Sequence, residues 1–321
     1  MTSSEMPSPT LSVVIPVYNE EEAVNELCSR VVAACGRVGL PFELVVINDG
    51  SVDGTLSRLI ELSRSHAELQ VVDLSRNFGH MAALHAGLTC ARGEAVVVMD
   101  GDLQDPPELI PELVARWRDG ADVAYGLRAS RGEGLFLRWL TAAFYRLLRL
   151  AARIEIPAQA GTFSLLSRKS VEILIHQVPE RSRYFAGLRA WLGGRQDRVT
   201  YQRHPRKSGQ SRVGLRGWSS LARRAFIGFS YLPLRVASLF SLLGSLAFLL
   251  VGGATVVLRL ATPRPVPGWA STMTLVGFLA FTQSVVLFFI CEYVAVLYDE
   301  VKRRPLSLIR SRIQGGKRME G

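Results

Sequence analysis

Short apolar runs alternate with amphipathic stretches over roughly the first 125 residues of the chain. The runs are β-type, because they are brief, rich in Val, Ile and Leu, and end at polar or turn-forming residues. Five strands are therefore predicted, at Leu11–Val17, Phe42–Ile47, Leu69–Leu74, Ala95–Met99 and Asp122–Tyr125. Helices are predicted between them, from Glu20 to about Arg37, from Asp53 or Thr55 to about Ser65, over Gly79–Ala91 and from Pro106-Pro107 onward. Strands alternating with helices indicate an α/β fold, with a mostly parallel sheet and helices on both faces.

Two long apolar stretches lie in the last third of the chain. Val236–Leu258 contains no charged residue, and Met273–Leu297 contains only Glu292. Each can cross about 30 Å of hydrocarbon at about 1.5 Å per residue. A buried hairpin of a soluble protein is the alternative, but the Pro-rich connection at Thr262–Trp269 disfavours it. We therefore predict two transmembrane helices over residues 233–300.

Two further stretches mix apolar and basic residues. Leu135–Ile154 has arginines between apolar residues at helical spacing, so it is either a surface helix or a helix lying on the bilayer. Residues 214–232 are predicted to form an amphipathic juxtamembrane segment.

The formal net charge of +10 requires an anionic partner. The first 120 residues or so are balanced, whereas basic residues crowd the flanks of the two apolar stretches. They comprise Arg203, Arg206, Lys207, Arg212, Arg216, Arg223, Arg224 and Arg235 before the first, Lys302, Arg303, Arg304, Arg310, Arg312, Lys317 and Arg318 after the second, and only Arg259 and Arg264 between. By the positive-inside rule, the α/β domain, both termini and a basic tail over residues 301–321 are expected in the cytoplasm. No nucleic-acid-binding motif occurs, and the aromatic residues form no stacking platform, so nucleic acid is not an expected partner.

The N-terminal segment and the cysteines agree with a cytoplasmic domain. Residues 1–10 have neither the basic nor the apolar region of a signal peptide and are expected to be disordered. Cys28, Cys35, Cys90 and Cys291 show no C-x-x-C spacing, so they are interpreted as reduced packing residues.

Polar residues follow the predicted strands. Asp49, Arg76-Asn77, Asp100 with Asp102, and Arg128 all come just after a strand, and ligands of open α/β sheets bind beyond the carboxyl ends of the strands. Asp100-Gly101-Asp102 followed by Gln104 offers hard oxygen ligands suited to Mg²⁺ or Mn²⁺ that already carries phosphates. A solvated acidic turn is the alternative for an isolated D-x-D. No G-x-G-x-x-G follows the first strand, and no P-loop sequence occurs.

The motifs resemble those of family-2 glycosyltransferases. They are SVVIPVYNEEEAV, INDGSVDGT, LSRNFGHMAALHAGL and VVVMDGDLQDPPE, in that order over Leu11–Glu108. The later RSRY, GLRAWLGGRQ, R-x-x-G-x-S-R and EYVAVLYDEVKRRPL segments are similar to polyprenyl-phosphate glycosyltransferases, a group that includes dolichol-phosphate mannose synthases and bacterial undecaprenyl-phosphate glucosyltransferases. The resemblance implies a cytoplasmic GT-A domain over residues 11–213.

The resemblance also implies roles for individual residues. Pro16, Tyr18, Glu20, Ile47 and Asp49 would hold the nucleoside, and Asp100 would approach the ribose or the diphosphate. Asp102 and Gln104, with Asp100, would ligate Mn²⁺ or Mg²⁺. Arg128, Arg206 and Arg212 would contact the phosphates of the donor, and Asp102, Arg128 and Arg131 would be the catalytic residues.

The chain departs from the family pattern at two places. Relatives often carry an acidic-Thr-Gly-Asp-Phe-Arg-type segment where this chain has Gln159-Ala160-Gly161-Thr162-Phe163-Ser164, so the acidic residue sometimes proposed as a base is Gln159. The D-D-G-S motif keeps its second Asp as Asp49, but its first is Asn48.

The expected reaction is the inverting transfer of a sugar from a nucleotide sugar, of the UDP-glucose or GDP-mannose class, to undecaprenyl or dolichyl phosphate. A lipid phosphomonoester is already anionic at neutral pH, because its second pKa lies near ~6, so it needs no general base. Two rival functions remain. A processive polysaccharide synthase would carry Q-x-x-R-W, whereas Leu135–Trp139 lacks the Gln. A non-catalytic membrane scaffold would not need the acidic and basic residues retained here. The oligomeric state is left open.

Overall fold

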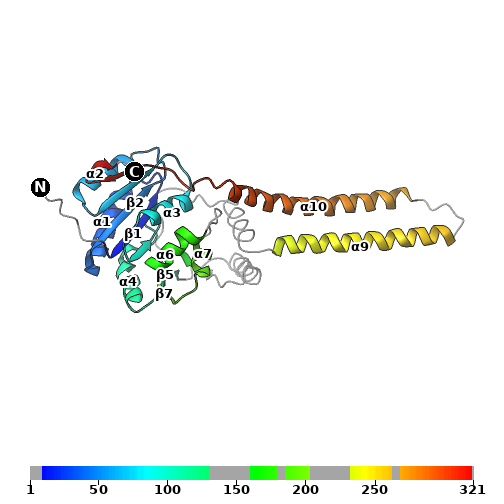
Figure 1. Ribbon diagram of the computed structural model, residues 1–321, viewed down its shortest axis with the longest axis horizontal. Coiled ribbons are helices and arrows are strands. Elements are labelled where there is room, and N and C mark those ends of the chain that lie inside the picture. The colour runs from blue at the N-terminus through cyan, green and yellow to red at the C-terminus, as the bar shows by residue number, and fades with distance from the viewer. Residues whose placement is uncertain (1–8, 130–159, 179–184, 203–231, 262–267, 320–321) are drawn as a thin grey trace.

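A single sheet organises the domain in the computed structural model, which describes residues 9–129, 160–178, 185–202, 232–261 and 268–319 (Figure 1). Its nine strands lie in the order β7-β5-β6-β4-β1-β2-β3-β8-β9. In chain order they are β1 (Leu11–Val17), β2 (Phe42–Asn48), β3 (Leu69–Leu74), β4 (Ala95–Val98), β5 (Val123–Arg128), β6 (Ala160–Ser167), β7 (Gln196–Tyr201), β8 (Ile309–Gln314) and β9 (Lys317–Met319).

The sheet is mixed but mostly parallel. β1 pairs in parallel with β2 and β4, β2 with β3, and β5 with β7. β6 lies antiparallel between β4 and β5, and β8 is antiparallel to both β3 and β9. Only β6 and β8 therefore run against the other described strands, and the carboxyl ends of β1 to β5 share one edge.

Helices cover both faces of the sheet, which confirms the expected α/β class. One apolar cluster joins the sheet to α1 (Val24–Val38), α2 (Thr55–Ser65) and α4 (Ile110–Arg118), which follows the short η1 turn (Pro107–Leu109). The opposite cluster includes α3 (His80–Cys90), α6 (Arg168–Glu172), η2 (Ile173–Gln177) and α7 (Phe185–Trp191). Val13 and Ile15 of β1 face the first cluster and Val14 faces the second. Because both faces are buried, the strands are continuously apolar.

The first helix begins later than expected. Glu20 was predicted to open it, but α1 starts at Val24. The backbone N–H groups of Glu20 and Glu21 donate instead to the side chains of Thr55 and Asp53, at 2.9 and 3.3 Å. The acidic triplet therefore belongs to a turn held by the loop after β2.

The segment predicted as a basic tail, residues 301–321, adds two strands to the sheet. β8 pairs with β3 along Gln70–Leu74, and β9 pairs with β8. Ile313 is fully buried in the first apolar cluster, and Arg310 Nη1 lies 3.6 Å from the buried Asp73 Oδ2. These contacts are long-range, so the basic composition of the segment did not indicate that it contains a half-buried strand of the sheet.

Two long helices, α9 (Leu232–Ala261) and α10 (Trp269–Val301), form a hairpin that extends from the domain (Figure 1). Membrane-length segments lie at Leu234–Ala254 and Thr274–Val301, with 12% and 0% of their residues buried. Apolar side chains so exposed fit contact with lipid, as predicted for two spans. Gly244 of α9 faces Thr282 of α10, where an added Cβ would lie 3.7 Å from the Thr methyl carbon.

Because α9 follows β7 and α10 precedes β8, both ends of the hairpin join the same sheet. The domain and the C-terminal strands therefore lie on one side of any membrane that the hairpin crosses. The segments expected at Leu135–Ile154 and 214–232 lie outside the described residues, except for Leu232, the first residue of α9.

Candidate functional site

Polar residues from several strands meet at the shared carboxyl edge of the sheet. Asp49 follows β2, Asp100, Asp102 and Gln104 follow β4, and Arg128 ends β5. We call these five residues the strand-end site. The antiparallel β6 begins at the same edge, where Ala160 pairs with Leu127. The expected convergence is therefore present for these five residues.

Asp49 anchors the loop before α3. The residue is 3% exposed, and its carboxylate accepts the backbone N–H groups of Phe78, at 2.8 Å, and Gly79, at 3.0 Å. Burial raises the pKa of Asp49, and the two N–H groups act in the opposite direction. Gly50 has φ +65°, and a Cβ there would overlap the backbone of Arg76, so glycine allows the two loops to touch. Asp49 thus has a structural role, and its contact with a nucleoside stays a prediction.

Two loops at this edge are joined by hydrogen bonds. Asn19, with φ 53°, donates its N–H to Ser51 Oγ at 3.0 Å and accepts the N–H of Val52 at 2.9 Å. Together with the bond from Glu20 to Thr55, these contacts hold Tyr18 and Glu20 half-buried at the edge. The sequence reasoning missed Asn19, although it lies inside the matched Y-N-E motif.

Ile47 lies in the core rather than at the surface of the site. Its side chain is fully buried in the apolar cluster beneath α3, where a Cβ on Gly87 would strike it. Successive strand residues face opposite sides of the sheet, and Ile47 faces the helix. Its side chain therefore lies in the core, and a contact of Ile47 with a nucleoside stays a prediction. Pro16 is also buried.

The acidic turn after β4 fits a divalent ion. Asp102 Oδ1 accepts the backbone N–H of Gln104 at 3.2 Å, and the intervening Leu103 is buried with φ 56°. A left-handed, non-glycine residue costs about 1–2 kcal/mol, so the surrounding packing holds the turn in this form. Asp100 Oδ1 is buried and makes no hydrogen bond within the described part of the chain. Two carboxylates and an amide oxygen are the hard donors that Mg²⁺ and Mn²⁺ prefer.

The side chains of the described residues do not complete a metal site by themselves. Across the described ranges, no group of three or more His, Cys, Asp or Glu residues could hold a metal ion. An ion at Asp100, Asp102 and Gln104 would therefore need further oxygen ligands, as phosphates or water supply.

His80 lies beside this turn and was missed by the sequence reasoning. It is the first residue of α3, and its Nε2 lies 3.3 Å from Asp100 Oδ1. Since Asp49 holds the loop at Phe78 and Gly79, the start of α3 links the acid after β2 to the acid after β4. Its position in the R-N-F-G-H motif, directly after a strand, was the signal that could have identified it.

Arg128 contacts two buried polar side chains, those of Tyr201 and Asp105. Its Nε donates to Tyr201 Oη at 3.3 Å, and its Nη2 lies 3.8 Å from Asp105 Oδ1. Tyr201 Oη in turn donates to Asp105. Burial would lower the pKa of Arg128, but the charge of Asp105, the phenol of Tyr201 and the charge of Asp100 raise it overall. Arg128 is therefore a stable cation within the field of the acidic turn.

Several predicted residues lie outside the described ranges, so their roles stay predictions. They are Arg131, Gln159, Arg206 and Arg212. Directly after Gln159, the divergent segment forms the start of β6. Ser164, at the position of the family Arg, is fully buried and donates to the carbonyl oxygen of Thr162 at 3.0 Å.

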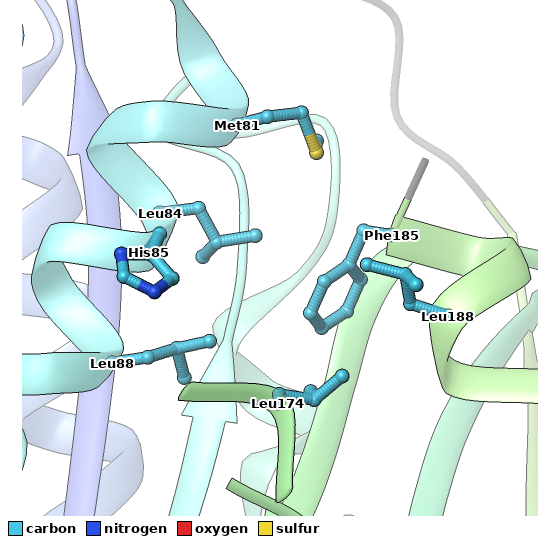
Figure 2. Close-up of a pocket in the computed structure, with 7 residues that line it drawn as sticks. All are labelled: Met81, Leu84, His85, Leu88, Leu174, Phe185 and Leu188. Carbon is cyan, nitrogen blue, oxygen red and sulfur yellow. The ribbon is translucent and has the colours of Figure 1, made fainter. Parts of the chain in front are cut away.

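A small apolar pocket lies between α3, η2 and α7 (Figure 2). Its volume is about 10 Å³, which is room for about one water molecule. It is lined by Met81, Leu84, His85, Leu88, Leu174, Phe185 and Leu188. None of these residues is acidic, so the pocket differs in chemistry from the strand-end site.

Comparisons with known proteins agree on one family. The model described as Glycosyl transferase family 2 matches residues 12–174. An uncharacterized glycosyltransferase of Synechocystis sp. is 40% identical over 300 residues, which cover 93% of this chain and 94% of that protein. The bactoprenol glucosyl transferase of Shigella phage SfII is 36% identical over 308 residues, covering 95% of this chain and 99% of the relative.

Among solved structures, the chain is similar to glucosyl-3-phosphoglycerate synthase from Mycobacterium tuberculosis in complex with Mn²⁺, UDP and glucosyl-3-phosphoglycerate. The TM-score is 0.45 at 21% identity, covering 68% of this chain and 78% of that one.

Proposed function

The chain belongs to glycosyltransferase family 2, and from this premise we propose that it transfers a hexose from a nucleotide sugar to a polyprenyl phosphate at the membrane surface. The bactoprenol glucosyl transferase that it resembles along nearly its whole length supports this acceptor. The word glucosyl in that name makes UDP-glucose the first donor to test, and GDP-mannose the second.

The site and the membrane hairpin are connected to the same sheet, and this arrangement supports the proposed function. The acidic turn and Arg128 lie at the carboxyl edge of the sheet. The same sheet contains β8, the strand that follows the membrane-length hairpin. Two acids that hold a divalent ion, together with a nearby arginine, suit a nucleoside diphosphate. The hairpin keeps the domain where a lipid phosphate is found. A soluble acceptor would not require such an anchor.

Asp102 and Gln104, with Asp100, would hold Mn²⁺ or Mg²⁺. Such an ion, when bound, supplies positive charge that stabilises the departing nucleotide diphosphate. Arg128 adds a fixed cation at the same edge, and its planar fork suits phosphate oxygens.

The chemistry that remains for the chain is binding and alignment. An oxygen of the ionised lipid phosphate forms the new bond to the anomeric carbon, while the bond from that carbon to the diphosphate breaks. No proton has to be removed, because the second pKa of a phosphomonoester lies near ~6. This agrees with Gln159 and Thr162 at positions where relatives are often acidic. A single displacement of an α-linked donor gives a β-linked product.

The acceptor phosphate requires further cations close to the membrane. Arg131, Arg206 and Arg212 are proposed for this role from the sequence alone. The excess of basic residues beside both spans supports a cytoplasmic location of the domain. At the domain end of α10, Lys302 Nζ lies 4.0 Å from the ring centroid of Tyr298, a pair suited to a membrane interface.

The test is transfer by membranes that contain the full chain. They are incubated with undecaprenyl phosphate and, separately, UDP-glucose, GDP-mannose and UDP-linked amino sugars, and the lipid product is identified by its mass. NMR of the purified product then gives its anomeric configuration. We expect one hexose per lipid and a β linkage with one donor. A long glycan would indicate a processive synthase, and no transfer from any donor would favour a scaffold.

A further inference from the structure

A buried acid lies behind Arg128. Asp105 is fully buried, although it follows the acidic turn by only a few residues. Transfer of a carboxylate from water into a protein interior is unfavourable unless charge and hydrogen bonds compensate it. Here Tyr201 donates a hydrogen bond to it, and the guanidinium of Arg128 lies 3.8 Å away.

The three side chains come from distant parts of the chain and form a defined arrangement. Arg128 Nε donates to the same phenol oxygen that donates to Asp105. Arg128 is 28% exposed while Asp105 is fully buried, so the guanidinium lies between the buried acid and the open edge. Burial raises the pKa of the Tyr201 phenol, so at neutral pH it remains a proton donor to Asp105.

Two glycines make room for this arrangement. A Cβ on Gly161 would lie 2.5 Å from Arg128 Nη2, and a Cβ on Gly126 would lie 2.7 Å from a ring carbon of Tyr201. The Tyr201 ring also packs edge-on against Phe163, with centroids 6.0 Å apart. Backbone and rings therefore restrict where the guanidinium can lie.

We propose that Asp105 and Tyr201 are positioning residues that hold the guanidinium of Arg128 toward the phosphates of the substrate. This inference rests on the proposed function, since it assigns Arg128 to phosphate. Tyr201 accepts the Nε–H of Arg128, and Nη2 lies 3.8 Å from Asp105 Oδ1, so two of the three guanidinium nitrogens have a buried partner nearby. Without Asp105 and Tyr201, Arg128 keeps its charge but loses its fixed orientation. A positive charge that is already oriented stabilises a developing anion.

A double-mutant cycle tests the proposal. Tyr201→Phe removes only the hydroxyl and keeps the ring beside Phe163. Arg128→Lys keeps the charge but removes the Nε–H that Tyr201 accepts. The donor kcat/KM is measured for the wild type, both single variants and the double variant at saturating polyprenyl phosphate. Tyr125→Phe, which removes a hydroxyl from a neighbouring residue of β5, is the matched control.

We expect Tyr201→Phe to lower kcat/KM about tenfold in the wild-type background and less than about twofold in the Arg128→Lys background. Tyr125→Phe is expected to lower it by less than about twofold in both. Equal losses from Tyr201→Phe in the two backgrounds would overturn the proposal, because a purely structural role does not depend on Arg128.

Folding is followed by thermal denaturation of each variant. If Tyr201→Phe is unfolded at the assay temperature, Asp105→Asn replaces it in the cycle with the same expectation, and loss of fold in both would show a structural role and overturn the proposal. Absence of transfer by the wild type refutes the proposed function separately. The cycle is then measured on the affinity for UDP with Mn²⁺ by calorimetry, where the same non-additivity is expected.

Discussion

The substitution Asn48→Asp restores the first acid of the D-D-G-S motif and should destabilise this chain. Asn48 Nδ2 donates to Asp73 Oδ1 at 2.8 Å, and both side chains are about 1% exposed. An aspartate at position 48 would replace that donor with a second carboxylate, at hydrogen-bond distance from the first. Two buried carboxylates this close do not both ionise, so the variant pair binds one proton when folded.

The cost of binding that proton sets the size of the effect. Protonating an aspartate with an unfolded pKa of about 3.9 costs about 4 kcal/mol at pH 7 and about 1.5 kcal/mol at pH 5, at 1.36 kcal/mol per pH unit. The protonated carboxyl then donates to Asp73 in place of the amide, so these values are upper bounds. The folded pair holds a proton that the unfolded chain releases, so its pKa is raised by folding. The variant therefore gains stability as the pH falls and loses it as the pH rises.

The assay is the thermal denaturation midpoint of the full chain in detergent between pH 5 and pH 8. Relative to the wild type, Asn48→Asp is expected to lower the midpoint by roughly 10 °C at pH 7 and roughly 4 °C at pH 5, at about 2–4 °C per kcal/mol. Asn77→Asp, at an exposed position, is the control and should change it little. Adding Asp73→Asn to Asn48→Asp reverses the donor and acceptor and should restore most of the loss. A shift that does not change with pH, or that the second substitution fails to restore, would refute the reasoning.

Three further predictions follow from single sites. Asp102→Asn should lower the rate of sugar transfer by about 100-fold or more with little change in melting temperature. A chelator should abolish wild-type transfer until Mn²⁺ or Mg²⁺ is returned. Full activity of the variant, or of the wild type in chelator, would exclude the metal site. Gly161→Ala should lower the rate of sugar transfer about tenfold, because its Cβ would lie 2.5 Å from Arg128 Nη2. Gly36→Ala, whose Cβ would have no atom within 4 Å, is the control and should be neutral. Equal rates for the two variants would show that the guanidinium moves at no cost. Burial raises the pKa of Cys28 and Cys35 to about 12, with a small addition from Glu68 at Cys35, so at pH 8 maleimide should modify them only after unfolding. Mass spectrometry of the native chain checks the last prediction, and native labelling of either thiol would contradict it.

Local pattern was sufficient for strands β1 to β5, helices α1 to α4 and the acidic turn, whereas strands β6 to β9 were not predicted from it. The run at Leu69–Leu74 is β3 residue for residue, and the D-x-D pair follows β4 as expected. These features depend on neighbours in the sequence, because strand burial requires continuous apolar residues and a parallel sheet presents its ligand residues at strand ends. The two spans are determined in the same way, by length and hydropathy.

Tertiary structure decided which side chains complete the site. Tyr201 and Asp105 are 96 residues apart, and no short-range pattern marks them as partners. His80 meets Asp100 only because the start of α3 passes the end of β4. Ile47 has the residue type of its motif, but the alternation of the strand directs its side chain into the core.

The C-terminal segment gives the same distinction on a larger scale. Composition alone determines that residues 301–321 are basic, and it supports a cytoplasmic location. That Ile309–Gln314 pairs with β3 depends on an open strand edge that exists only after the sheet has assembled. Sequence determines what each segment can pair with, and the folded sheet determines which pairing buries Ile313 and brings Arg310 to Asp73.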